Sequence, residues 1–147
     1  MISRRGVLAG LAAMGAAPAF AGTITLDQLV GESLILGFLG STPDAEGADR
    51  IERDLAEGRI GGVLFLRHNA RTREGVLGLA RRFRAAAPNA WLAIDQEGGF
   101  VQRLTDEMGF TDIPTAEQLL DMGLENARPV LAQAAQELAQ SGFSMNL

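Results

Sequence analysis

The chain has 147 residues, of which 47% are hydrophobic and 21% are charged, and its formal net charge at pH 7 is −5. This composition is typical of a globular protein, and the lack of cysteine excludes disulfide frameworks, thiolate metal sites and cysteine nucleophiles. The negative net charge argues against a nucleic-acid partner, because phosphate backbones are bound by concentrations of basic side chains.

Residues 1–21 have the three parts of a secretory signal peptide. Arg4 and Arg5 form a basic start, residues 6–17 form a short apolar segment, and small residues lead up to Ala21. The basic pair and its neighbours resemble the twin-arginine export motif, while the apolar segment is too short to span a bilayer as a helix. The alternative is an uncleaved anchor helix or a chance apolar start. We expect an exported protein, periplasmic or extracellular, that is cleaved after Ala21 and whose mature chain has no integral membrane span.

Three elements are predicted at the start of the mature chain. A capping-box pattern beginning at Thr25 predicts a short helix. The continuous apolar run over 34–39 predicts a strand that is buried on both faces. Thr42 as a cap, with Pro43 at the first helical position, predicts a second helix that ends at Gly58. The predicted buried face of this helix consists of Ala48, Ile51 and Leu55.

Two further strands are predicted on either side of a third helix. Residues 61–66 and 90–94 are short apolar runs of the kind that buried parallel strands use. Thr72 is a candidate cap for the helix between them. The predicted buried face of that helix consists of Val76, Leu79, Ala80 and Phe83.

The last third of the chain is predicted to contain a long loop, two helices and a strand. The loop runs over 96–114, and a second capping box begins at Thr115. A final helix starts near Asn126, with Pro129 in its first turn, where no hydrogen-bond donor is lost. Residues 143–147 predict a fourth strand. Because strands alternate with amphipathic helices, the sequence predicts an α/β fold with a parallel sheet.

Candidate functional residues follow the third predicted strand. Asp95 comes directly after it, and parallel sheets carry their active sites at the carboxyl ends of their strands. Gly98 and Gly99 allow a sharp turn or a close approach to a ligand. Asp95 can accept hydrogen bonds from two sugar hydroxyls, and Arg103 offers a planar fork of donors. The alternative is a structural pair, in which Asp95 caps the turn and Arg103 neutralises its charge.

Other charged groups indicate no metal, cofactor or nucleic-acid site. The acidic residues within 44–57 alternate with Arg50 and Arg53, which is typical of a solvated helix face. The basic residues within 81–84 have no aromatic neighbours on which bases would stack. His68, the single histidine, is predicted to be a loop or rim residue.

The string Asp95-Gln96-Glu97-Gly98-Gly99-x-Val101-Gln102-Arg103 resembles glycoside hydrolase family 3, and within it the bacterial β-N-acetylhexosaminidase branch. Residues 61–69, 109–114 and 137–147 fit the same family in the same order. The resemblance covers residues 26–147, nearly the whole mature chain. It departs from the family at Phe100, where arginine is usual.

The resemblance implies the N-terminal part of a (β/α)8 TIM barrel, truncated after about three and a half βα units. It implies that the complete protein removes terminal β-linked N-acetylglucosamine from cell-wall glycan fragments by retaining hydrolysis, without metal or cofactor. Asp95 and Arg103 would then bind the substrate sugar.

The resemblance also implies that no catalytic residue lies in this chain, because the family's nucleophile and acid/base correspond to positions beyond Leu147. We therefore expect a signal peptide over 1–21, an incomplete family 3 domain over 22–147, and no activity from the 147-residue chain alone. The alternatives are a non-catalytic sugar-binding or interaction remnant, and a β-glucosidase of the same family.

Export predicts a defined N-terminus. When the chain is expressed in a bacterium with a twin-arginine pathway, the protein recovered from the envelope fraction should begin at Gly22 by N-terminal sequencing. A control in which Arg4 and Arg5 are both changed to Lys should stay in the cytoplasm with its leader attached. Recovery of envelope protein that begins at Met1 would contradict the signal-peptide interpretation.

Overall fold

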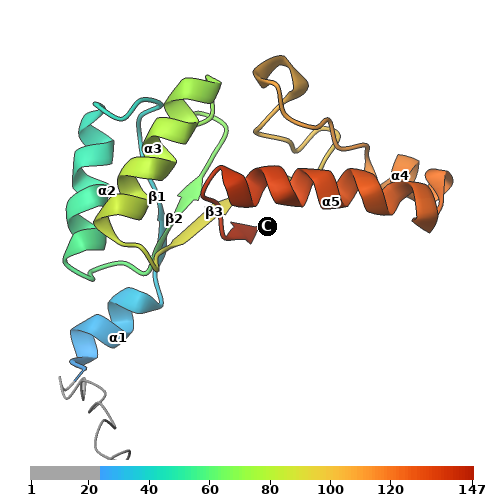
Figure 1. Cartoon of the computed structure of the whole chain (residues 1–147). Coiled ribbons are helices and arrows are strands. Elements are labelled where there is room, and N and C mark those ends of the chain that lie inside the picture. Colours follow the sequence, from blue (N-terminus) through green and yellow to red (C-terminus); the bar gives the residue numbers. More distant parts are fainter. Residues whose placement is uncertain (1–23) are drawn as a thin grey trace, which may run out of the picture.

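The computed structural model describes residues 24–147; the predicted signal peptide and its cleavage after Ala21 lie outside the described residues. The described part contains a four-stranded parallel sheet with the strand order β1-β2-β3-β4 (Figure 1). The strands are β1 (Ile35–Gly37), β2 (Gly62–Phe65), β3 (Trp91–Ile94) and β4 (Met145–Asn146). The predicted α/β class with a parallel sheet is confirmed.

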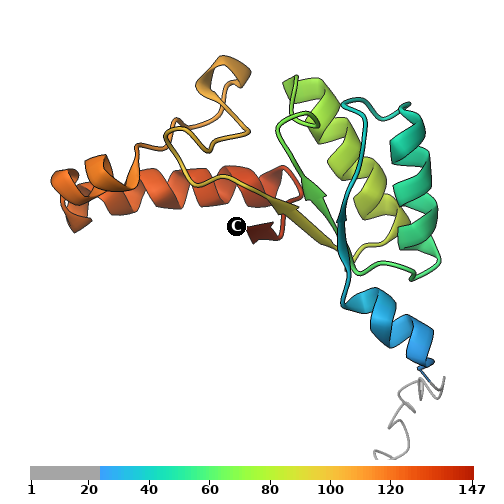
Figure 2. The same cartoon turned by 180° about the vertical axis from the view of Figure 1, so that it is seen from behind.

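Five α-helices accompany the sheet in residues 24–147: α1 (Leu26–Glu32), α2 (Glu46–Ala56), α3 (Arg73–Ala86), α4 (Ala116–Met122) and α5 (Leu124–Gln140). A short 3-10 helix, η1, spans Asp106–Met108 inside the long loop. Seen from both sides, α2 and α3 lie together beside the strands, while α5 and the loop before it extend away from them (Figures 1 and 2). Within the described part of the chain, no helix is long and apolar enough to cross a membrane.

The core of the sheet is built on phenylalanine rings from distant parts of the chain. Phe65 of β2 packs edge-to-face against Phe38, which follows β1, with ring centroids 5.3 Å apart. Phe83 of α3 and Phe143, which precedes β4, contact the same ring at 5.9 Å and 5.0 Å. Edge-to-face contacts bring the positive ring edge to the negative ring face and stabilise beyond simple burial. The four rings therefore connect the first strand to the last.

The predicted helix caps and buried faces are largely confirmed. Thr25 and Thr115 both form complete capping boxes, and Thr72 accepts a hydrogen bond from the backbone of Gly75 at 3.1 Å. The buried residues of α2 and α3 include every predicted one: Ala48, Ile51, Leu55, Val76, Leu79, Ala80 and Phe83. These signals are local, so they are readable without knowledge of the tertiary structure.

Strand β1 is not buried on both faces, and that prediction is wrong. Ile35 and Leu36 are 37% and 41% exposed. The strand pairs only with β2 and forms the edge of the sheet in the described residues. An apolar run shows that a strand could be buried, but not which strand of a sheet lies at its edge.

Helix α2 starts later than predicted. Its N-cap is Ala45, which makes no side-chain capping bond, and the helix begins at Glu46 instead of after Thr42. The backbone N–H of Ala45 donates to the carbonyl of Thr42 at 3.2 Å, so residues 42–45 form a turn. The carbonyl of Pro43 is bound by Arg82 from α3, and this tertiary contact holds the turn out of the helix.

The predicted position of Pro129 in helix α5 is also wrong. The helix begins at Leu124, so Pro129 is its sixth residue and lies in the helix interior. Proline has no N–H, so the carbonyl of Glu125 loses its partner within the helix. The apolar side chains of this helix are only partly buried: Ala134 is buried, whereas Leu131 is 44% exposed.

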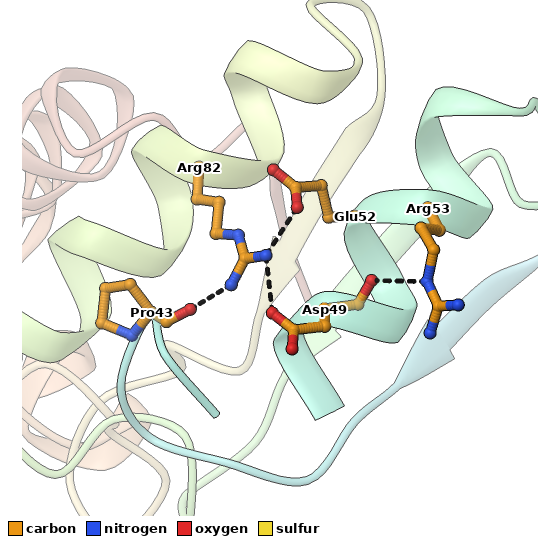
Figure 3. Close-up of polar contacts among 5 residues, drawn as sticks. All are labelled: Pro43, Asp49, Glu52, Arg53 and Arg82. Carbon is orange, nitrogen blue, oxygen red and sulfur yellow. Dashed lines mark hydrogen bonds and ion pairs between the residues drawn. The ribbon is translucent and has the colours of Figure 1, made fainter. Parts of the chain in front are cut away.

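Arg82 joins α3 to α2 and to the turn before it (Figure 3). Its Nη2 donates to Asp49 at 2.7 Å and to Glu52 at 2.5 Å, and its Nη1 donates to the carbonyl of Pro43. The hydrogen bond from Arg82 lowers the pKa of Glu52, and the two carboxylates raise the pKa of Arg82. The acidic side of α2 is therefore partly neutralised by the neighbouring helix.

The contacts of Arg82 predict a pH-dependent loss of stability. Arg82→Gln should lower the free energy of unfolding at pH 7 by about 1–2 kcal/mol, because it removes two ion pairs and weakens a carbonyl contact. The pKa of Glu52 is lowered in the folded state, so its stabilising contribution exists above its unfolded pKa and disappears as the pH falls through the folded value.

Urea denaturation at pH 7 and at pH 3 measures this effect. The difference between the wild type and Arg82→Gln should be smaller at pH 3. The exposed Arg81 on the same helix provides the control, and Arg81→Gln should change stability little at either pH. An Arg82→Gln effect that grows at low pH would refute the assignment.

Candidate functional site

A narrow hairpin follows β3 at the carboxyl end of the sheet. Asp95 and Arg103 face each other at its base, where Arg103 Nη2 donates to Asp95 Oδ2 at 2.6 Å. Higher up, the backbone N–H of Glu97 donates to the carbonyl of Val101 at 2.8 Å. The structure therefore brings together the two predicted site residues, eight positions apart, across one loop.

The turn of the hairpin requires glycine at two positions. Gly98 and Gly99 have φ angles of 99° and 56°, which side chains disfavour. A Cβ on Gly98 would lie 2.6 Å from the carbonyl oxygen of Pro114, and one on Gly99 would lie 2.5 Å from a methyl carbon of Thr115. The predicted sharp turn is confirmed, and the close approach is to the chain itself.

The pair at the base of the hairpin is mostly buried but not fully hydrogen-bonded. The side chains of Arg103 and Asp95 are 15% and 21% exposed. Within the described residues, Arg103 Nε is buried and has no hydrogen-bond partner. Buried polar groups are normally paired, so this donor is an exception within the hairpin. Asp95 Oδ2 is engaged by Arg103, which leaves the other carboxylate oxygen for hydroxyl donors.

Gln96 fixes the returning strand of the hairpin. Its side chain is buried, and its Oε1 accepts from the backbone N–H groups of Arg103 and Leu104, both at 2.9 Å. Its Nε2 donates to the carbonyl of Leu104 at 2.8 Å. Both the oxygen and the nitrogen of the Gln96 amide therefore form hydrogen bonds with the backbone of Arg103 and Leu104.

The backbone of Gln96 is held in turn by Asn146 of β4. Asn146 Oδ1 accepts from the N–H of Gln96 at 2.8 Å, and Asn146 Nδ2 donates to its carbonyl at 2.9 Å. This side chain takes the place of a neighbouring strand just beyond the last paired residue of β3. A chain of two amides therefore connects β4 to the backbone of Arg103.

The rest of the long loop is attached to both flanking helices. On α5, the carboxylate of Glu137 accepts from the backbone N–H and the hydroxyl of Thr111 at 2.7 Å and 2.8 Å. Burial raises the pKa of Glu137, but these bonds, another from Gln133 and the charge of Arg73 together bring it below its ordinary value. On α3, the guanidinium of Arg73 stacks over Phe110 at 4.2 Å.

The end of β2 contributes a second polar group to the same edge of the sheet. Asn69 is fully buried, accepts from the backbone of Leu66 at 2.8 Å, and donates to the carbonyls of Phe38 and Gly40. His68 Nε2 lies 2.7 Å from the same Phe38 carbonyl, which can only accept, so this nitrogen carries the proton. The loop position predicted for His68 is confirmed.

Two grooves are described in residues 24–147, and neither is lined by Asp95 or Arg103. One lies between β1 and α2 and is lined by Leu36 and Ile51 among others. Another runs along α5 and reaches Gln96 and Asn146. In residues 24–147, no cluster of three or more histidine, aspartate or glutamate side chains is placed to hold a metal ion.

Comparison with known proteins identifies relatives of one kind. A β-hexosaminidase of Stenotrophomonas maltophilia (strain K279a) is 30% identical over 121 residues, which are 77% of this chain and 34% of that protein. A β-hexosaminidase of Xylella fastidiosa (strain 9a5c) is 34% identical over 107 residues, which are 72% of this chain and 29% of that protein. No family model matches the chain.

Solved structures give the same result. A glycoside hydrolase family 3 β-N-acetylglucosaminidase from Paenibacillus superimposes with a TM-score of 0.71 at 29% identity, covering 84% of this chain and 23% of that one. NagZ from Neisseria gonorrhoeae, in complex with N-trifluoroacetyl-D-glucosamine, superimposes with a TM-score of 0.60 at 26% identity, covering 75% and 33%. The chain is therefore similar to a portion of enzymes described as β-hexosaminidases and as glycoside hydrolase family 3 β-N-acetylglucosaminidases. It spans about a third of the length of the curated relatives it matches.

Sequence reasoning missed two residues that shape this hairpin. Gln96 and Asn146 have neutral amide side chains, whereas the candidate site residues were chosen among charged side chains. Gln96 lies inside the string that carries the resemblance, which is a signal that could have indicated it. Asn146 lies 50 positions away, and only the pairing of β3 with β4 brings it to the site.

The role of Gln96 predicts a specific loss of stability. Gln96→Ala should lower the free energy of unfolding by about 2–4 kcal/mol, because it leaves the N–H groups of Arg103 and Leu104 without partners in a buried region, while the Leu104 carbonyl keeps a hydrogen bond from Gln102. The exposed Gln136 on α5 offers a matched control, and Gln136→Ala should change stability by less than about 0.5 kcal/mol. Urea denaturation of both variants measures the difference. Equal effects of the two substitutions would show that the hairpin does not depend on Gln96.

Proposed function

We propose that this chain provides the part of a family 3 β-N-acetylhexosaminidase that binds the terminal sugar. The single observation that carries the proposal is the Asp95–Arg103 ion pair at a strand end, in which Arg103 engages only one of the two Asp95 carboxylate oxygens. Relatives named β-hexosaminidase and β-N-acetylglucosaminidase support an N-acetylglucosamine-containing glycan as the substrate.

In the proposed complex, Asp95 accepts hydrogen bonds from neighbouring hydroxyls of one sugar ring. Arg103 orients the carboxylate through the hydrogen bond from its Nη2, and its guanidinium adds positive charge beside the bound sugar. Hydrogen bonds to charged groups contribute about 1.5–3 kcal/mol each, which is enough to select a sugar over water. Both residues bind and orient the sugar, and neither breaks a bond.

The proposed reaction of the whole protein is retaining hydrolysis of a terminal β-linked N-acetylglucosamine, through a covalent sugar–enzyme intermediate. We assign neither the nucleophile nor the acid/base to residues 24–147, so the chain alone is proposed to bind sugar without hydrolysing it. The parallel order of β1 to β4 supports a further proposal, that these strands belong to a (β/α)8 barrel.

The proposed location is outside the cytoplasm. The basic pair at Arg4 and Arg5, the short apolar segment and the small residues before Gly22 support a leader over 1–21 and a mature domain over 22–147. Cell-wall glycan fragments are the proposed source of the substrate.

Binding of the sugar tests the proposal. Titration of the ¹⁵N-labelled chain with N-acetylglucosamine should shift the amide signals of the hairpin. Asp95→Asn should weaken binding at least about tenfold, because the neutral amide loses charge-assisted hydrogen bonds. Arg103→Lys should also weaken binding, because an ammonium group lacks the planar fork of donors.

Controls separate a binding role from a structural one. Asp112 is an exposed carboxylate in the same loop, and Asp112→Asn should bind the sugar as the wild type does. Thermal melts of every variant show whether the fold persists. If Asp95→Asn binds the sugar with wild-type affinity, or if its loss of binding is explained entirely by unfolding, the Asp95–Arg103 pair has a structural role and no binding role. Tighter binding of glucose than of N-acetylglucosamine would favour a β-glucosidase.

A further inference from the structure

Phe100 stands at the tip of the hairpin and is 98% exposed. The other phenylalanines in the described residues are Phe38, Phe65, Phe83, Phe110 and Phe143, and each of them is at most 7% exposed. A single exposed apolar side chain is ordinary on a protein surface. The position of Phe100 is what distinguishes it, because the base of the same hairpin carries Asp95 and Arg103.

The tip that carries this ring is held rigidly. The N–H of Gly99 donates to the carbonyl of Ile113 at 2.8 Å, so the residue before Phe100 is fixed to the far side of the loop. On the other side, Val101 is bonded in both directions to Gly98 at 3.2 Å. A ring presented on a fixed backbone loses little conformational freedom on binding, which favours its use as a contact.

The ring is also close enough to the ion pair to act on the same ligand. Arg103 is three positions after Phe100, and an extended chain covers at most about 3.6 Å per residue, so the two backbones are within about 11 Å. Two linked pyranose rings span a distance of this order. A substrate whose terminal sugar contacts Asp95 can therefore place its next ring at Phe100.

The chemistry of the surroundings favours a ring-sized ligand over a protein. Within residues 92–119, no other large hydrophobic side chain is exposed, and the neighbouring Glu97 is polar and exposed. Stable protein interfaces bury several hundred Å² on each partner around an apolar centre. One isolated ring among polar groups is too small for that, but it matches one face of a sugar.

We propose that Phe100 is an aromatic platform for the second ring of a β-linked sugar chain, beside the terminal ring bound by Asp95 and Arg103. The inference rests on the proposed function and adds a contact with the second sugar of the chain. One face of a pyranose consists of C–H groups with partial positive charge, and the face of an aromatic ring is negative. Phenylalanine has no hydrogen-bonding group, so the contact selects a ring of suitable shape and not a particular hydroxyl pattern.

A comparison of one-ring and two-ring ligands tests the platform. The ¹⁵N-labelled chain is titrated with N-acetylglucosamine and with its β-1,4-linked disaccharide. Phe100→Ala should weaken binding of the disaccharide about three- to tenfold and change binding of the single sugar less than about twofold. Phe100→Trp should retain the disaccharide affinity, and Phe100→Leu should behave as Phe100→Ala does, because leucine has apolar area but no ring.

Matched controls keep the result specific. Leu26 is 75% exposed on α1, which lies at the opposite end of the sheet from the hairpin, so Leu26→Ala should bind both sugars as the wild type does (Figure 1). Phe100→Ala removes an exposed ring, and its thermal melt should match the wild type. Light scattering follows the oligomeric state of each variant.

The outcomes distinguish this inference from the proposed function. If Asp95→Asn weakens binding while Phe100→Ala leaves the preference for the disaccharide unchanged, the platform is refuted and the proposed function stands. An equal effect of Phe100→Ala on both sugars also refutes the platform. A change in oligomeric state in Phe100→Ala without a change in sugar affinity would make the ring a contact between copies of the chain. Failure of the wild type to bind either sugar refutes both.

Discussion

Side-chain amides complete the hydrogen bonding of the main chain where the parallel strands end, and the geometry of the hairpin depends on them. A strand that leaves its sheet has N–H and C=O groups without partners, and each such group is costly when buried. Asn69 satisfies three of these groups beyond β1 and β2, and Asn146 satisfies two beyond β3. The backbone of Gln96 is held by Asn146, and the side chain of Gln96 in turn fixes the backbone of Arg103 by accepting a hydrogen bond from its N–H.

The long loop after β3 is an ordered part of the fold, because hydrogen bonds and packing contacts connect it to the sheet and to helices α3 and α5. Loops of this length without regular structure are uncommon unless they carry function. Here the carboxylate of Glu137 and the guanidinium of Arg73 hold the loop from α5 and α3, by charged hydrogen bonds and a ring contact. The ion pair of Asp95 and Arg103 is therefore supported from the sheet and from two helices, which keeps its position fixed before any ligand arrives.

Features that depend on short stretches of sequence were predictable, and features that depend on tertiary partners were not. The buried faces of α2 and α3 and the pairing of Asp95 with Arg103 follow from spacing within one helix or one loop. The exposure of β1 depends on the position of that strand in the sheet. The late start of α2 accompanies a hydrogen bond from Arg82, 39 positions away, to the carbonyl of Pro43, and the local signals at Thr42 and Pro43 do not show such a contact.

Pro129 gives helix α5 two halves of unequal stability. The missing N–H breaks the ladder of hydrogen bonds after the first turn, and α5 contacts the short α4, which has no buried residue. The second half is anchored by Glu137 to the loop and by Leu138 to the core. Local opening can therefore release α4 and the start of α5 as one unit while the anchored half stays folded. Backbone fluctuations of this kind would leave the hydrogen bonds of Asp95, Gln96 and Arg103 in place, because their partners lie outside α4 and α5.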